Sequence, residues 1–144
     1  MRSYPALVLE KCSDGKATWW RLAEPAWCCD VVDGSKYVIP AGFVSNLASM
    51  PRLLYVIEPP HGRSAIPSVK HDYRYIMLVG VEKYGYRQAR LHADRQYYLD
   101  LQAAGMKKYR AYLFYVGVRL GGWWPWRRHT QRRLLDLLRK EDLD

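Results

Sequence analysis

The residues best suited to chemistry are an adjacent histidine and aspartate, His71 and Asp72, with Tyr75 a short distance along the chain. On a helix, His71 and Tyr75 are four residues apart and share a face. Asp72 is turned about 100° from His71. It could therefore bind a hard cation such as calcium together with loop carbonyl oxygens.

Asp94 falls within the apolar stripe of the next predicted helix. A carboxylate in such a stripe is costly unless it is paired or hydrogen-bonded. We therefore predict that Asp94 accepts hydrogen bonds from His71 and Tyr75 on the preceding helix. This arrangement would fix the histidine tautomer and leave the other ring nitrogen free to take a proton from water. The alternative is a purely structural polar cluster that ties the two helices together.

The pattern of the chain predicts an α+β fold: a small N-terminal antiparallel sheet, a long loop, and three to four helices. Val-, Leu-, Trp- and Tyr-rich runs predict strands, joined as a meander, at 6–10, 17–23, 27–32 and 36–39. Asp14-Gly15 and Asp33-Gly34 are typical of tight hairpins. Helical periodicity and glycine stops predict helices at 66–79, 87–104, 107–120 and 127–140, with residues 123–126 as an aromatic elbow.

A length of 144 residues fits a single domain. Its expected parts are a strand region (1–40), a loop with a helical turn near 51–56 (41–65), a helical core (66–122) and a basic C-terminal helix (123–144). No apolar run approaches the ~20 residues that span a bilayer, and no secretory signal is expected. Three cysteines, two of them adjacent, indicate buried thiols in a reducing compartment.

The positive charge is concentrated at one end of the chain. The formal net charge is +9, and residues 107–140 hold ten basic residues and one acidic residue, so the rest is neutral. A basic end favours an anionic partner: a membrane surface, nucleic acid or an acidic protein surface. Amphipathic rings and cations near its start would suit such a partner. The candidate binding residues are Trp123, Trp124, Trp126, Arg127, Arg128, Arg132 and Arg133. Alternatively, the leucines of this helix pack on the domain and its charges are only solvated.

Four short blocks, in order and suitably spaced, resemble an uncharacterised family encoded in tailed phages and prophages. They are Pro40-Ala41-Gly42-Phe43, the loop 45–52 ending in Ser49-Met50-Pro51-Arg52, His71-Asp72-Tyr73-Arg74-Tyr75, and Ala93-Asp94. The resemblance implies a protein made in a bacterial host cytoplasm that acts there or in the virion. In the loop, Asn46 stands where that family usually has an acid.

The His-Asp-x-x-Tyr helix followed by a helical Asp also resembles the catalytic helices of phospholipases A2. That resemblance implies His71 as the general base for a water, Asp72 as a calcium ligand, and Asp94 and Tyr75 as residues that orient the histidine. Asn46 would be a further ligand, which brings no charge. We therefore expect either calcium-dependent lipid ester hydrolysis at an anionic membrane, or a non-enzymatic tail or virion component that binds a partner protein or nucleic acid.

Overall fold

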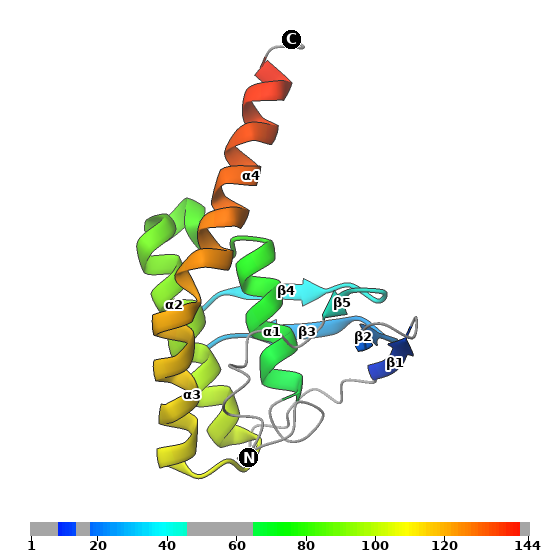
Figure 1. The fold of residues 1–144 in the computed structure, drawn as a ribbon, viewed down its shortest axis with the longest axis vertical. Helices are drawn as coiled ribbons and strands as arrows, with labels where there is room; N and C mark the ends of the chain where they lie inside the picture. Colours follow the sequence, from blue (N-terminus) through cyan, green and yellow to red (C-terminus); the bar gives the residue numbers. More distant parts are fainter. Residues whose placement is uncertain (1–8, 14–17, 46–64, 142–144) are drawn as a thin grey trace.

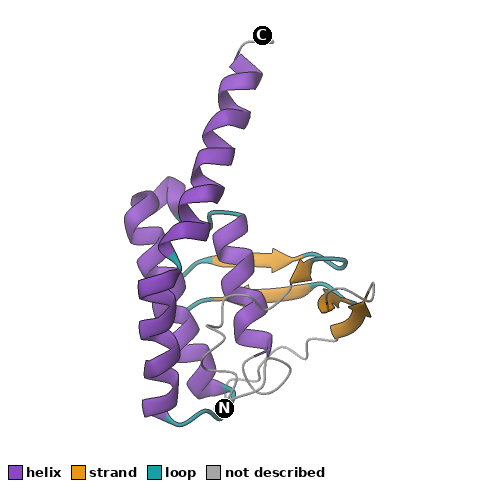
Figure 2. Cartoon of the chain, in the orientation of Figure 1, coloured by secondary structure: helices purple, strands orange, loops and turns teal. Residues whose placement is uncertain are grey.

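The computed structural model describes residues 9–13, 18–45 and 65–141, and it has the predicted α+β organisation (Figure 1). Antiparallel strands of the N-terminal part lie to one side of four helices (Figure 2). The hairpin expected at Asp14-Gly15, the helical turn near 51–56 and Asn46 fall outside the described residues.

The strands form two small sheets, so the prediction of one meander is wrong. The strands are β1 (Leu9–Ser13), β2 (Thr18–Leu22), β3 (Ala26–Cys29), β4 (Lys36–Ile39) and β5 (Val44–Ser45). One sheet has the order β1-β2-β5 and the other pairs β3 with β4. Pro25, which has no N–H to donate, separates β2 from β3. The Leu22 N–H instead donates to the Phe43 carbonyl, and the Gly42 N–H donates to the Leu22 carbonyl.

The hairpin of β3 and β4 closes through residues 30–35, where Asp33-Gly34 was predicted to turn. Gly34 has φ of 71°, which glycine adopts without the strain that a Cβ would bring. The Gly34 N–H donates to the Asp30 carbonyl, and the Asp30 N–H donates to the Ser35 carbonyl. This turn carries two aspartates, Asp30 and Asp33, toward the helices.

The helices are α1 (Ala65–Ile76), α2 (Val81–Ala103), α3 (Lys108–Gly121) and α4 (Trp123–Glu141). Gly85 interrupts α2 with a φ of 80° and ψ of 166°, a conformation largely confined to glycine. The aromatic elbow expected at 123–126 is instead the first turn of α4. Pro125 is compatible with that position because the first N–H groups of a helix have no intrahelical acceptor.

The core divides into three apolar clusters. One joins the strands to α1 around Leu22, Ile39 and Val69. Another joins α2 to α3 around Tyr97 and Phe114. The third brings Tyr75, Ala89, Ala93 and Trp126 together, so that α1, α2 and α4 meet. None of the described helices has the length and apolar character needed to cross a membrane. The C-terminal part of α4 projects beyond the rest of the molecule (Figure 1).

Candidate functional site

The structure brings His71 of α1 and Asp94 of α2 into direct contact inside the protein. The His71 Nε2 atom lies 2.6 Å from Asp94 Oδ1. The side chains are 4% and 0% exposed, respectively, so water does not screen their interaction. Because an ionised carboxylate only accepts hydrogen bonds, this contact places the histidine proton on Nε2.

Asp94 also accepts the other predicted hydrogen bond. The Tyr75 hydroxyl donates to Asp94 Oδ1 at 2.6 Å. Burial and the neighbouring Asp94 carboxylate hold the pKa of the Tyr75 hydroxyl well above its usual value. The tyrosine therefore remains a hydrogen-bond donor to Asp94 across the physiological pH range.

Two arginines that the sequence analysis did not single out complete the surroundings of Asp94. Arg119, in the last turn of α3, donates to Asp94 Oδ2 at 2.8 Å and compensates the buried charge. Arg90 of α2 donates to the Tyr75 hydroxyl at 3.3 Å and to the Val118 and Arg119 carbonyl oxygens at the end of α3. These carbonyls lie in the last turn of α3, and that of Val118 also accepts the Gly122 N–H. Arg90 and Arg119 therefore join α3 to the site.

The His71 ring is held between two aromatic rings, and one of its nitrogens has no partner. Its centroid lies 4.2 Å from the ring of Tyr75 and 4.8 Å from that of Tyr97. The Nδ1 atom is buried and makes no hydrogen bond with a described residue. An unsatisfied buried polar atom costs about 1–3 kcal/mol. The arrangement thus fixes the orientation of the imidazole and leaves Nδ1 without a partner among the described residues.

The backbone of Gly122 approaches this cluster closely at the junction of α3 and α4. A Cβ at Gly122 would lie 2.6 Å from the Tyr75 hydroxyl and 2.4 Å from the Val118 carbonyl oxygen. Trp126, one turn later, sets its ring 5.0 Å from that of Tyr75 in an edge-on arrangement. The glycine therefore lets α4 begin directly against the tyrosine.

Asp72 lies on another face of α1, as the sequence predicted. The Ser45 hydroxyl of β5 donates to Asp72 Oδ2 at 2.5 Å. In the described ranges, no three His, Cys, Asp or Glu side chains gather where they could hold a metal ion. Calcium requires several oxygen ligands, and Asn46 and the loop expected to supply them lie outside the described residues. The calcium site therefore stays a prediction.

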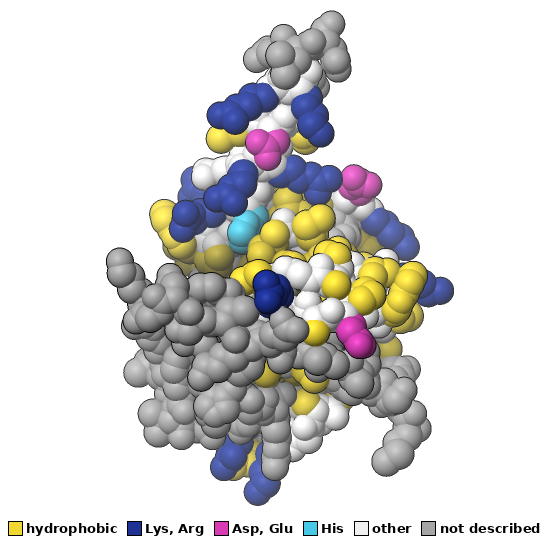
Figure 3. Space-filling view, turned by 90° about the vertical axis from the view of Figure 1, so that its right-hand side faces the viewer, with side chains coloured by type: hydrophobic (Ala, Val, Ile, Leu, Met, Phe, Trp, Pro, Cys, Tyr) yellow, Lys and Arg dark blue, Asp and Glu magenta, His cyan; other side chains and the backbone are white. Residues whose placement is uncertain are grey.

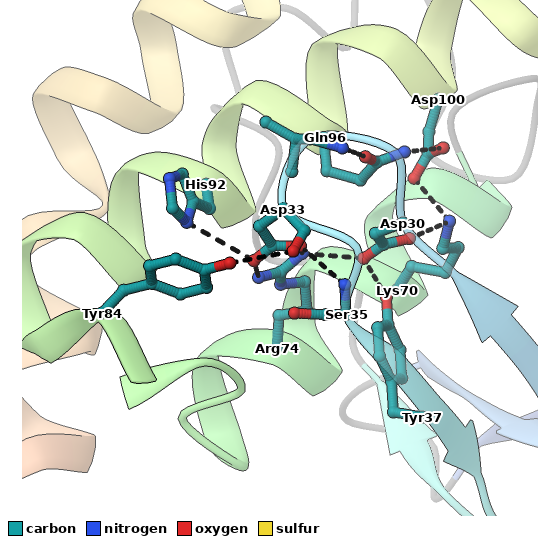
Figure 4. Close-up of polar contacts among 11 residues, drawn as sticks. Asp30, Asp33, Ser35, Tyr37, Lys70, Arg74, Tyr84, His92, Gln96 and Asp100 are labelled. Carbon is teal, nitrogen blue, oxygen red and sulfur yellow. Dashed lines mark hydrogen bonds and ion pairs between the residues drawn. The ribbon is translucent and has the colours of Figure 1, made fainter. Parts of the chain in front are cut away.

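A second charged cluster, which the sequence analysis missed, lies on a neighbouring face of α1, turned about 100° from His71 (Figure 4). Arg74, 1% exposed, donates to Asp30 Oδ2 at 2.8 Å and to Asp33 Oδ2 at 2.6 Å. Lys70 lies 3.0 Å from Asp30 Oδ1 and 2.8 Å from Asp100 Oδ2. Burial alone would lower the pKa of Lys70, but Asp100 and Asp30 outweigh it and raise the pKa. The cluster joins the β3–β4 turn to α1 and α2.

Neutral side chains extend this second cluster. The Tyr37 hydroxyl donates to Asp30 at 2.7 Å, and the Gln96 amide donates to Asp100 at 2.9 Å. Lys70 and Arg74, four residues apart, share one face of α1, but nothing in the sequence indicated which carboxylates would pair with them. Each of these charges is paired, which indicates a structural function: the cluster fixes the rotation of α1 and hence the direction of His71.

The residues predicted to bind an anionic partner all lie on α4, but they do not share one environment. Trp126 is buried against Tyr75, whereas Trp123 and Trp124 are about half exposed. Arg127 lines a groove with residues of α2 and α3, and Arg133 lies 3.2 Å from Glu82. Arg128 and Arg132 are exposed. Figure 3 shows Lys and Arg side chains around the projecting part of α4.

The leucines of α4 are about half exposed, so both alternatives for this helix stay open. Their exposed fractions range from 48% to 59%. They are Leu134, Leu135, Leu137 and Leu138. The helix therefore presents apolar and basic side chains together to its surroundings.

Comparison with known proteins identifies one family. The family described as "Protein of unknown function (DUF1353)" matches residues 20–118, which include the end of β2, the strands after it, α1, α2 and most of α3. His71, Tyr75, Asp94 and the second charged cluster all fall within the match. Neither a curated protein nor a solved structure matched the chain significantly.

Proposed function

The chain belongs to the DUF1353 family, and we propose that it is a phage- or prophage-encoded accessory protein that hydrolyses lipid esters with His71 as its general base. One observation carries this proposal. Nε2 of His71 is bonded to Asp94 at 2.6 Å, while the buried Nδ1 has no hydrogen-bond partner among the described residues. A histidine held in this way has the tautomer and orientation required to remove a proton from water.

In this mechanism a water bound at Nδ1 gives up its proton to His71 as its oxygen attacks the ester carbonyl carbon. Asp94 stabilises the imidazolium that forms, because its carboxylate remains hydrogen-bonded to Nε2. Tyr75 and Arg119 position Asp94 through their own hydrogen bonds to it. The imidazolium then returns the proton to the leaving alkoxide as the carbon–oxygen bond breaks. No step is assigned to calcium.

The proposed place of action is an anionic membrane surface, which is supported by the composition of α4. Amphipathic helices with Lys and Arg beside exposed apolar side chains bind at such interfaces. Leu135 and Leu138 are more than half exposed on α4, close to Arg139 and Lys140.

The test measures fatty acid released from phosphatidylglycerol vesicles by the full chain and by His71→Ala. A general base contributes roughly a hundredfold or more to the rate, so His71→Ala should lose that factor. His129→Ala, in the half-buried histidine of α4, is the matched control and should keep the activity. Parallel reactions with calcium and with a chelator test the calcium expectation. Equal rates for wild type and His71→Ala, with both proteins folded, would refute the assigned base.

A second function is favoured by the exposure of the α4 leucines. In this alternative the His71–Asp94 cluster is structural, and the protein is a tail or virion component that binds a partner protein or nucleic acid through α4. Stoichiometric incorporation into phage particles, unaffected by His71→Ala and lost on replacing Leu135 and Leu138 with serine, would support it. Absence of the protein from purified particles would count against it.

A further inference from the structure

A groove of about 500 Å³ lies where α2, the end of α3 and the first half of α4 meet. Four of the residues that line it are arginines, and none is acidic. These arginines are Arg87, Arg90, Arg119 and Arg127. Asp94 pairs with Arg119 at 2.8 Å and lies 3.9 Å from Arg90, so one buried carboxylate compensates only part of the charge of the four guanidinium groups, and the remaining positive charge attracts an anion. We infer that this groove binds a phosphate-bearing anion.

The two arginines at the inner side of the groove are fixed in place by the protein. Arg90 is held by the Tyr75 hydroxyl and by the carbonyls at the end of α3, and Arg119 is held by Asp94. Each guanidinium has five N–H donors, and these contacts use only some of them. Both arginines can therefore donate to a ligand without releasing their present partners. A preorganised donor loses little entropy on binding.

The charges of the two outer arginines are not paired with any residue in the described part of the chain. Neither Arg87 of α2 nor Arg127 of α4 has a side-chain hydrogen bond or ion pair with a described residue. Arginine donors in fork geometry match the oxygens of a phosphate group and bind it bidentately. Arg87 and Arg127 approach the groove from different helices, so one phosphate placed between them would be held from two sides.

The remaining wall of the groove is apolar and aromatic. Trp123 and Leu134 are about half exposed there, and Trp126 forms the buried part of the wall. A ligand with a phosphate group and an organic portion would contact both the arginines and the apolar wall of the groove. A lipid headgroup and a soluble phosphate ester share this chemistry, and only experiment distinguishes the two sources. Anion binding in this groove does not depend on hydrolysis at His71, because the groove takes part in no chemical step.

The experiment titrates the full chain with inorganic phosphate and glycerol 3-phosphate by calorimetry, and with phosphatidylglycerol vesicles by tryptophan fluorescence. Arg87→Gln and Arg127→Gln should each weaken binding about tenfold, as expected for loss of a charge-assisted hydrogen bond. Arg95→Gln is the matched control, because its side chain is exposed on α2, the helix of Arg87, and lies outside the groove. The control should weaken binding less than about twofold by screening alone.

Binding of the soluble phosphates with this dependence would support the site and identify a free phosphate ester as its ligand. Binding of vesicles alone, with the same dependence, would support the site and identify a lipid headgroup. Equal losses in Arg87→Gln and Arg95→Gln would overturn the inference, because they would show a diffuse attraction to basic side chains. Absence of binding to all three probes would also overturn it. Activity of His71→Ala has no bearing on these outcomes.

Discussion

Replacing Gly122 with alanine should destabilise the protein through the buried tyrosine that it faces. A Cβ at this position would lie 2.6 Å from the Tyr75 hydroxyl, whereas ordinary contact begins at 3.4 Å. Relief of this contact requires a displacement of about 0.8 Å, the difference between those two distances. The Tyr75 hydroxyl already donates to Asp94 at 2.6 Å, so the displacement would be made at the expense of that bond.

The expected magnitude follows from three effects. Overpacking costs about 1–3 kcal/mol. Loss or distortion of the buried hydrogen bond costs about 1 kcal/mol more. The reduced freedom of the unfolded chain returns about 0.4–1 kcal/mol. We therefore expect Gly122→Ala to lower the free energy of unfolding by roughly 1–3 kcal/mol, as measured by urea denaturation.

The neighbouring glycine is the matched control. Gly121 is the last residue of α3, and a Cβ there would have no atom within 4 Å. Gly121→Ala should therefore raise the free energy of unfolding by about 0.5–1 kcal/mol, the usual gain from alanine in a helix.

A double-mutant cycle with Tyr75→Phe separates the two contacts that a Cβ would make. In that background the hydroxyl is absent, so Gly122→Ala should cost less, and only the approach to the Val118 carbonyl remains. If Gly122→Ala were as stable as wild type, or if its cost were unchanged in Tyr75→Phe, the close approach to Tyr75 would not exist as described.

Three further predictions follow from burial and charge. Asp94→Asn should lower the free energy of unfolding by roughly 3–5 kcal/mol, because it leaves the Arg119 guanidinium without its buried counter-charge; urea denaturation at neutral pH measures this, and a change below 1 kcal/mol would contradict it. The folded protein should lose stability as the pH rises above about 10. Burial and Asp94 raise the pKa of Tyr75, and burial and Asp30 raise that of Tyr37. Each phenol therefore contributes its full stabilisation below its unfolded pKa of about 10 and loses it as the pH rises further. Ultraviolet absorbance of ionised tyrosine should then increase together with the loss of circular dichroism, and full ionisation of a protein that stays folded would disprove this. In a Cys12→Ser background, iodoacetamide at pH 8 should modify the exposed Cys29 well before Cys28, whose pKa burial raises to about 11; mass spectrometry of each peptide decides.

The contacts around Asp94 could be predicted in part because helix periodicity shows which residues of each helix share a face. A carboxylate within an apolar stripe needs partners, and His71 and Tyr75 were the polar residues that shared one face of the preceding helix. The sequence contained no comparable indication for Arg119. It lies on α3, and a basic residue near the end of a helix is usually explained by solvation or by the helix dipole.

The second charged cluster could not be predicted for a related reason. Asp33 was assigned correctly to a turn, but turn aspartates generally bond to their own backbone, as Asp33 does with the Ser35 N–H at 3.1 Å. Nothing local indicated that the same carboxylate also pairs with Arg74, forty-one residues away. The two-sheet topology was missed because the pairing of β2 with β5 depends on the chain after Ile39 turning back at Gly42.

The structure contains the predicted hydrogen bonds of His71 and Tyr75 with Asp94, but it does not test the catalytic and ligand-binding assignments. That His71 is a base, that Asp72 binds calcium, and that α4 binds an anionic partner are predictions, and the experiments above test them.

The attachment of α4 has a mechanical consequence. Its 19 residues make a stiff rod about 28 Å long. The base of the rod is fixed where Trp126 packs against the Tyr75 ring, and further along Arg133 lies 3.2 Å from Glu82 of α2. A force applied to the free end of α4 is therefore transmitted through Trp126 to the Tyr75 ring, whose hydroxyl donates to Asp94.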